Sequence, residues 1–327
     1  MATAENAKLE YEAGQAAVAM SALTDSGGAT VFTSAAATWS GRSGYAPVVR
    51  PDGLLTGGAI TPAVTNNVVN VAALTCNLAG VVTSVAGAPV TITRPAGNVA
   101  KVISITVNSS GALAAVAGTD GATTTFSETR GAAGGPPLIP VGSIEIGQVR
   151  VTSNTAAVVT SAQIYAVPGL HVERADYPPA SINYATGKVT FAEALPLIHT
   201  GSVAKKVYFR GAAPLFAPIP KTSDWVPAEA TYSINSTDTY DGPVGSASSS
   251  LGQASFNAIL TDGITDAFLA QSGKDIWVEF RPDRDKLVPK QLTQGILGIG
   301  RTFPAGGGSF TAACTVTPRE KTLDVKA

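Results

Sequence analysis

The sequence has few charged residues and no excess of either sign. Lys, Arg, Asp and Glu make up 14% of the 327 residues, whereas an ordinary globular protein has roughly 25%. The 22 basic and 23 acidic residues nearly cancel, which argues against a general binder of nucleic acid or of membrane surfaces. A surface with so little charge repels its own copies only weakly, and low net charge favours association.

Cysteine and histidine are also scarce, with two of each. Cys76 and Cys314 form no CxxC pair, and we expect two buried thiols in a reducing compartment. His171 and His199 have none of the common zinc-ligand spacings, so we expect polar residues at strand edges or turns. The sequence therefore predicts no metal site and no cofactor.

The familiar catalytic motifs are incomplete. Residues 41–44 are one residue short of the GxSxG nucleophile elbow. Residues 186–188 lack the upstream glycine of a phosphate loop, and residues 298–303 fail the dinucleotide fingerprint at its third glycine. No feature of the sequence specifically favours catalysis by Asp or Glu side chains. We therefore expect no catalytic residues and no enzyme.

Long apolar runs are absent as well. No run approaches the roughly 18 residues that a membrane span needs, and residues 1–15 show neither a positively charged n-region nor an apolar h-region. We therefore expect a protein that is made in the cytoplasm without an export signal and has no membrane partner.

The sequence is rich in short β-branched runs with a period of two, separated by Gly, Pro and Asn clusters. The clearest runs are 69–71, 90–93, 102–107, 144–146, 149–151, 275–281, 295–303 and 309–317. Asn183–Phe191 adds a hairpin signal, because Gly187 can take the positive φ of a tight turn. This pattern is typical of an antiparallel β-sandwich or barrel.

Helical patterns are nearly missing. Residues 8–23 are rich in Ala, but Gly14 interrupts them and their apolar spacing is poor, so we expect an arm that leads into a strand. Gly263–Gln271 is the one predicted α-helix: Asp262 can cap it and Gly273 can end it.

Aromatic residues are distributed unevenly along the chain. Phe126 is the only one between Ala46 and Ile164, whereas most Tyr and two of the three Trp follow Ile164. We therefore expect residues 1–50 to be an N-terminal arm with the first strands, 51–210 a Val/Ala/Thr-rich β module, and 211–327 a heavier domain. The boundary is placed at the Pro-rich stretch 212–218, which cannot lie inside a central strand.

A long polar arm interrupts the last domain. Asp238–Gly252 is a run of Gly, Ser, Asp and Pro between a strand-like segment and the apolar segment 255–260, and it is predicted to be nearly structureless. The residues of the arm that favour turns and loops are Asp238, Asp241, Gly242, Pro243, Gly245 and Gly252.

The order of these elements resembles the tail tube (major tail) protein of long-tailed bacteriophages. A strand at 232–238 is followed by the polar arm, a strand at 255–260, the predicted helix and three closing strands. The resemblance covers the last third of the chain and lies in the arrangement rather than in a catalytic motif. Residues before Pro214 fit it less well and look like an accessory β module of phage virion proteins.

The resemblance implies a virion protein that is assembled in the host cytoplasm. Two packed antiparallel sheets with one flanking α-helix would form the tube domain. Hexameric rings of this protein would stack into the hollow tail tube, through which DNA leaves the capsid without specific binding. Its partners would be copies of itself and other tail proteins, such as the tape measure and terminator proteins.

The resemblance also suggests roles for particular residues. The Asp238–Gly252 arm would be mobile in the free subunit and would order against a neighbouring subunit or ring. Acidic side chains facing the lumen would repel DNA phosphates; Glu279 is the first candidate, and Asp266 and Asp275 are weaker ones. Intersubunit ion pairs are expected in the charged loop, at Arg281, Asp283, Arg284 and Asp285.

Two other classes of function share this composition. A surface-exposed β adhesin would need an export signal or an anchor. A β-rich hydrolase or a protein that decorates a capsid or tail would show activity or stay monomeric, rather than form polymers of variable length.

Overall fold

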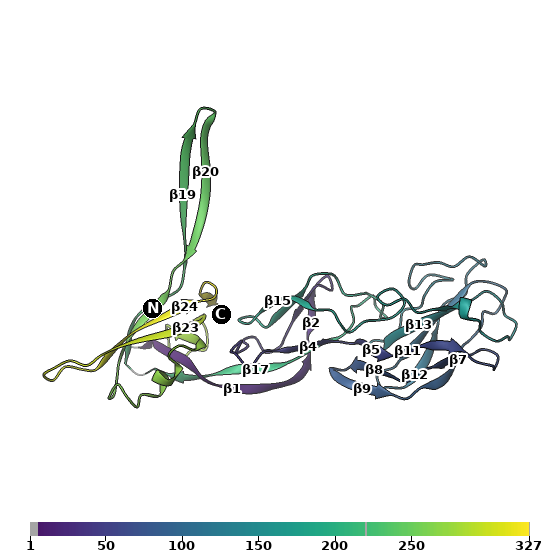
Figure 1. Ribbon diagram of the computed structural model, residues 1–327, viewed down its shortest axis with the longest axis horizontal. Coiled ribbons are helices and arrows are strands. Elements are labelled where there is room, and N and C mark those ends of the chain that lie inside the picture. The colour runs from purple at the N-terminus through teal and green to yellow at the C-terminus, as the bar shows by residue number, and fades with distance from the viewer. Residues whose placement is uncertain (1–5, 220, 327) are drawn as a thin grey trace. The chain divides into compact units, whose positions relative to one another are not determined.

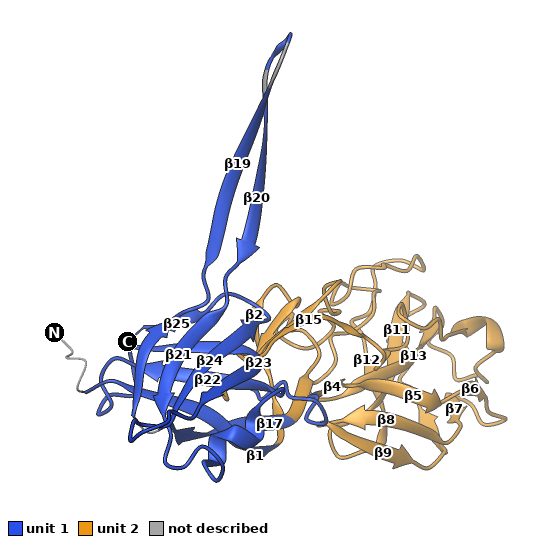
Figure 2. Ribbon diagram, turned by 60° about the vertical axis from the view of Figure 1, so that its left-hand side comes forward, with its two compact units in different colours: residues 1–18, 38–47, 211–327 blue, residues 19–37, 48–210 orange. Residues whose placement is uncertain are grey.

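A computed structural model describes residues 6–219 and 221–326. The protein is mainly β, as predicted: strands make up 50% of the chain and helical residues 3%. The chain divides into two compact units, drawn in blue and orange in Figure 2. Unit 1 contains Met1–Val18, Thr38–Pro47 and Gly211–Ala327, and unit 2 contains Ala19–Ala37 and Val48–Arg210. The first 50 residues are thus divided between the two units.

Unit 1 is built on an antiparallel sheet whose strands follow the spatial order β18, β21, β24, β23, β22 and β1, with β25 paired to β23. Figure 2 labels all of these strands except β18. Their bounds are β1 Lys8–Ala22, β18 Thr222–Val226, β21 Ala254–Ile259, β22 Asp275–Arg281, β23 Lys290–Thr302, β24 Thr311–Pro318 and β25 Leu323–Val325. The Ala-rich segment near the N-terminus is therefore a strand, because it pairs with β22 through Lys8–Tyr11.

The two faces of β22 carry different kinds of side chain. Ile276 and Val278 belong to the apolar core of unit 1, together with Leu9 and Phe256. The alternate residues Trp277 and Glu279 lie on the opposite face and are buried as well. The Nε1 of Trp277 donates to the carbonyl oxygens of Trp39 (2.8 Å) and Ser40 (3.0 Å), so that residues 38–47 supply a cover for this second face.

The predicted α-helix at Gly263–Gln271 is wrong. Only Ala267–Gln271 is helical, as a 3-10 helix (η3), and no α-helix is found among the described residues. Asp262 accepts the backbone N–H groups of Ile264 and Thr265, both at 2.7 Å. These side-chain bonds hold the chain in turns and compete with helical hydrogen bonds, and Gly263 has a φ of 71°.

Unit 2 contains several smaller antiparallel sheets. Their strand orders are β10-β7-β6, β12-β11-β13-β14, β15-β16-β3-β2 and β5-β8-β9. The bounds are β2 Thr24–Gly27, β3 Val31–Thr33, β4 Val48–Pro51, β5 Gly53–Gly57, β6 Ile60–Pro62, β7 Val68–Val71, β8 Leu74–Leu78, β9 Val81–Val85, β10 Ala88–Thr91, β11 Lys101–Val107, β12 Leu113–Ala117, β13 Ile144–Val151, β14 Ile164–Tyr165, β15 Pro179–Asn183 and β16 Lys188–Phe191; η2, a 3-10 helix, is Ser161–Gln163.

The main core of unit 2 is aliphatic. Every residue of β11 and β13 is buried, and their Val and Ile side chains pack with those of β7, β8 and β10. Cys76 lies in this core, whereas Cys314 lies in the core of unit 1. Both cysteines are free and buried, as predicted, and burial raises the pKa of the Cys314 thiol to about 12. His171 and His199 are buried too, and Nε2 of His199 lies 2.9 Å from the carbonyl oxygen of Ser143.

The Pro-rich stretch 212–218, where the domain boundary was predicted, directly follows the division between the two units at Arg210 and Gly211. It is the second half of β17, Val207–Pro218. The pairing of β17 with β4 ends at Arg210, so Pro214 lies where no hydrogen bond to β4 is required. A proline is tolerated in a strand at such an edge position.

The hairpin predicted at Asn183–Phe191 is confirmed. β15 and β16 pair antiparallel, with Asn183 opposite Lys188, and Gly187 has a φ of 61° in the turn. The turn is tied to β3 as well, because the N–H of Ser34 donates to the carbonyl oxygen of Gly187 at 2.9 Å.

We expect Gly187→Ala to destabilise unit 2 by about 1–2 kcal/mol, the cost of placing a side chain in the left-handed region. Gly187→Asn is the matched control and should cost less, because Asn tolerates this conformation. Urea unfolding followed by circular dichroism measures both. Equal stability of the Ala variant and the parent would show that the turn relaxes without cost.

Candidate functional site

The polar arm forms a β-hairpin. β19 (Ala230–Thr239) pairs with β20 (Gly242–Leu251) over ten residue pairs, from Ala230 opposite Leu251 to Thr239 opposite Gly242. The hairpin projects away from the sheet of unit 1 (Figure 1). The prediction of a nearly structureless Asp238–Gly252 is therefore wrong, since most of this segment is β20. Hydroxyl pairs join the two strands, with Thr231 and Ser250 at 2.8 Å and Ser233 and Ser248 at 2.7 Å.

The residues singled out in the arm lie around the turn and along β20. Asp241 is exposed beside Gly242, which has a φ of 114°, and Gly245 lies opposite Ser236. The N–H of Gly252 donates to the carbonyl oxygen of Glu229 at 2.9 Å, closing the base of the hairpin. Asp238 and Pro243 face each other across the ladder, but their side chains lie outside the described part of the structure.

The hairpin has one apolar and one hydroxyl-rich face. Residues directly opposite each other in an antiparallel pair lie on the same face, and alternate residues lie on opposite faces. The register therefore gathers Ala230, Tyr232, Ile234, Ala247 and Leu251 on one face, together with Ser236 and Ser249. The other face carries mainly Thr, Ser and Asn. Tyr232 and Ile234 are 79% and 80% exposed, so nothing in the described chain covers the apolar face.

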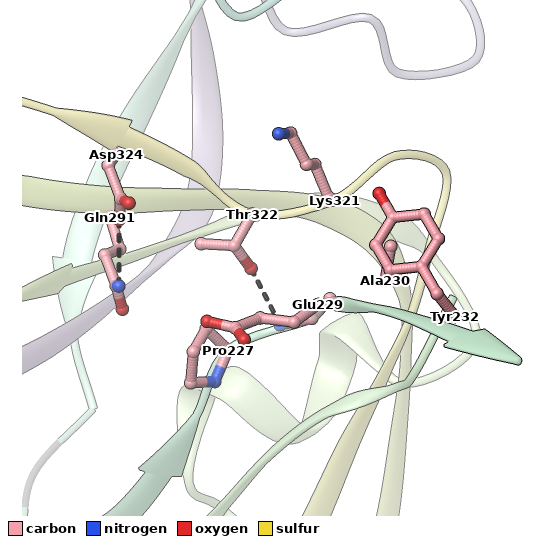
Figure 3. Close-up of a pocket in the computed structure, with 9 residues that line it drawn as sticks. Pro227, Glu229, Ala230, Tyr232, Gln291, Lys321, Thr322 and Asp324 are labelled. Carbon is pink, nitrogen blue, oxygen red and sulfur yellow. Dashed lines mark hydrogen bonds between the residues drawn. The ribbon is translucent and has the colours of Figure 1, made fainter. Parts of the chain in front are cut away.

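The base of the hairpin is fixed to the sheet of unit 1. The N–H of Ala228 donates to Oγ1 of Thr322 at 2.8 Å, and the N–H of Thr322 donates to the carbonyl oxygen of Ala228 at 2.8 Å. Gln291 of β23 donates from Nε2 to Oδ1 of Asp324 at 3.0 Å. Figure 3 shows these contacts around a polar pocket of about 260 Å³, lined by Pro227, Ala228, Glu229, Ala230, Tyr232, Gln291, Lys321, Thr322 and Asp324. The hairpin is thus anchored at its base and exposed along its length.

The structure removes Glu279 from the lumen candidates. Its side chain has 0% exposure and pairs with Lys290 at 2.7 Å and with Nε of Arg281. The alternation of β22 predicted correctly that Glu279 lies opposite Ile276 and Phe280, but that second face is covered rather than open. Glu279 neutralises buried cations within its own unit.

The two weaker acidic candidates have local partners. Burial acts to raise the pKa of Asp266, but backbone N–H groups of Thr261 and Gly263, both at 2.9 Å, outweigh it and lower that pKa. Burial raises the pKa of Asp275, against the effect of its ion pair with Arg319. Both carboxyl groups hold the fold of unit 1 locally.

The charged loop is also paired within the unit. Arg281 lies 3.4 Å from Oε2 of Glu10 besides its contact with Glu279, and Asp283 pairs with Lys286 at 3.2 Å. The N–H of Arg284 donates to the carbonyl oxygen of Asn6 at 2.7 Å, and the N–H of Asp285 donates to Asp283 at 3.1 Å. The named residues of the charged loop thus have bonding partners within their own unit.

A second cluster, in unit 2, escaped the sequence patterns because its residues are far apart in the chain. The ammonium group of Lys205 is fully buried and donates to the carbonyl oxygens of Asp52 (3.0 Å) and Arg174 (2.7 Å). It lies 3.4 Å from Oε1 of Glu173 and 4.9 Å from the centre of the Tyr177 ring. Glu173 in turn accepts the N–H of Glu145 at Oε2, at 2.8 Å.

Burial raises the pKa of Asp52 to about 7, and the nearby charge of Glu173 adds to this effect. Hydrogen bonds from the N–H groups of Gly80 and Ala79 act in the opposite direction, as does Lys205. Burial lowers the pKa of Lys205, while Glu173 opposes the shift. The cluster therefore holds Asp52 and Lys205 closer to their neutral forms than they are in water.

We expect the stability of unit 2 to fall as the pH rises from about 4 to 7. The pKa of Asp52 is higher in the folded chain than its ordinary value of 3.8, so the folded state binds more protons over this window and loses stability with increasing pH. At about 1.4 kcal/mol per pKa unit the penalty is at most about 4 kcal/mol. The groups that face Asp52 are Glu173, Lys205, Cys76, Tyr208 and the N–H groups of Ala79 and Gly80.

The variant Asp52→Asn tests this expectation. Its unfolding free energy, followed in urea at pH 5 and pH 8, should change less between these two pH values than that of the parent. If the two proteins show the same dependence on pH, the ionisation of Asp52 contributes nothing.

No protein-family model matches the sequence, and no curated protein matches it. Among the described residues, no group of three or more His, Cys, Asp or Glu side chains is arranged to hold a metal ion. The helices in the same residues are all too short to cross a membrane.

Proposed function

We propose that this chain is a structural virion protein that polymerises into stacked, hexameric rings forming the tail tube of a long-tailed bacteriophage. The observation that carries the proposal is the β19–β20 hairpin with its uncovered apolar face. An isolated two-stranded hairpin is only marginally stable in water, so a hairpin of ten pairs that exposes Tyr232 and Ile234 gains stability by packing on a partner.

A second copy of the same chain is the partner that fits best. The hairpin is weakly charged, with hydroxyl groups on one face and apolar groups on the other, and the chain as a whole has few charges to repel its copies. Because the hairpin is already paired in the subunit, docking does not require a structureless arm to be ordered. The conformational entropy lost on assembly is correspondingly smaller.

The tube domain in this proposal is unit 1, with its sheet curled into a sandwich or barrel. Support comes from β22, whose alternating side chains Ile276 and Trp277 are both buried, so that both faces of the sheet are covered at this strand. In a ring, the exposed edges of such sheets would pair with neighbouring subunits, which removes a liability for aggregation.

Negative-stain electron microscopy of the purified protein, at low and high concentration, tests the proposal. We expect hollow tubes or stacked rings, with analytical ultracentrifugation showing species of variable length. In a second condition, the same microscopy is done after adding a phage-tail extract that contains the proteins that initiate assembly. Discrete monomers in both conditions would contradict a tube subunit and favour a decorating protein.

A further inference from the structure

We propose that Lys205 and Glu173 become joined by an intramolecular amide bond, formed by the folded protein itself. The proposal concerns unit 2 and is independent of the proposed tube function. It starts from the buried pair of these two residues, which are already in contact, with Nζ of Lys205 3.4 Å from Oε1 of Glu173.

Burial distinguishes this lysine from the other paired lysines. The side chains of Lys205 and Glu173 are 0% and 3% exposed. Lys101 and Lys290 also pair with carboxylates, at 2.9 and 2.7 Å, but their side chains are 11% and 22% exposed. A buried ion pair incurs a large desolvation penalty, and condensation to a neutral amide removes both charges at once.

Some carboxylate oxygen atoms of this cluster accept no hydrogen bond from the residues that the structure describes. Within the described chain, no hydrogen-bond donor reaches Oε1 of Glu173 or Oδ1 of Asp52. The carbonyl oxygens of Asp52 and Arg174, which accept from the ammonium group, could accept the N–H of the new amide. The site therefore has acceptors ready for the product as well as for the reactants.

The reaction consumes no other reagent. A proton passes from the Lys205 ammonium group to the Glu173 carboxylate within the ion pair, and Nζ then attacks Cδ of Glu173, so that one C–N bond forms and one C–O bond breaks. The proton that leaves Nζ passes to the departing hydroxyl, which leaves as water. In sum, an ammonium and a carboxylate give an amide and one water.

Position and protonation both favour this step. Fixing the amine against the carboxyl inside the fold replaces a bimolecular encounter, an advantage that can reach effective molarities on the order of 10⁵ M or more. Burial lowers the pKa of Lys205, which favours the neutral amine that attacks the carboxyl group.

The bond would link two distant parts of unit 2. Glu173 is held between β13 and β5, because its N–H donates to Glu145 and its carbonyl oxygen accepts from Leu54, both at 2.8 Å. Lys205 lies two residues before the start of β17. A covalent link between them would hold the start of β17 to these strands under force or in denaturant.

Mass spectrometry of the denatured full-length protein tests the proposal. The expected mass is lower than the sequence mass by one water molecule. Because Asp-Gly pairs such as Asp52–Gly53 can also lose water by closing to a succinimide, a peptide map must show one branched peptide joining Lys205 to Glu173. A full mass, or a water loss in an unbranched peptide, overturns the proposal.

The masses of variant proteins provide a second test of the proposal. Lys205→Arg and Glu173→Ala should have their full sequence masses, whereas Glu173→Gln should lose ammonia in place of water if it reacts. Lys206→Arg is the matched control, since Lys206 is exposed and should leave the water loss unchanged. If the first two variants fail to fold, the peptide map of the parent protein still decides the question.

Discussion

Replacing Tyr232 and Ile234 with serine is expected to abolish the formation of rings and tubes while leaving both units folded. Both side chains lie on the apolar face of the hairpin and are almost fully exposed in the single chain. Burying a large apolar side chain contributes about 1.5–3 kcal/mol, so the double variant should weaken each hairpin contact by about 3–6 kcal/mol. At about 1.4 kcal/mol per tenfold, the concentration needed for assembly rises by a factor on the order of 10² to 10⁴.

Sedimentation followed by electron microscopy measures this loss, and circular dichroism reports on the fold. The control is Ser233→Ala with Asn235→Ala, on the hydroxyl face of the same strand; it should assemble with a much smaller change in concentration. If the Tyr232 and Ile234 variant assembles at the same concentration as the parent, the apolar face is not the interface.

The strands were predictable where the signal is local. β11, β13 and β22 read as alternating β-branched or aromatic runs, and the structure places strands there, because the alternation of side chains follows directly from an extended backbone. The hairpin was missed because Ser, Gly and Pro favour turns on their own. Its pairing depends on cross-strand hydroxyl pairs such as Ser233 and Ser248, which no single-strand pattern reveals.

The sites were less predictable because they depend on contacts between distant segments. The alternation of β22 assigns Glu279 to the correct face, but whether that face is open depends on residues 38–47, more than two hundred positions earlier, where Trp39 accepts from Trp277. In the same way, Asp52, Glu173 and Lys205 match no sequence motif, and only the fold of unit 2 brings them together.

The buried carboxylate of Glu279 should matter more to stability than any exposed ion pair in unit 1. Glu279→Gln removes one negative charge between Arg281 and Lys290, whose side chains are themselves largely buried. Removing one partner of a buried ion pair typically costs about 3–5 kcal/mol because the remaining charge is left uncompensated. Glu10, which also pairs with Arg281, offsets part of this, so we expect a loss near the lower end, about 3 kcal/mol.

Urea unfolding followed by tryptophan fluorescence measures this loss, since all three Trp residues lie in unit 1. Lys286→Gln is the matched control: it breaks the more exposed pair with Asp283 and should change the unfolding free energy by less than about 1 kcal/mol. Glu279→Gln with Lys290→Gln should recover part of the loss, because the unpaired ammonium group is then gone as well. A loss below about 1 kcal/mol for Glu279→Gln alone would mean that water reaches the two cations and compensates them, and that the charged face of β22 contributes little to the stability of unit 1.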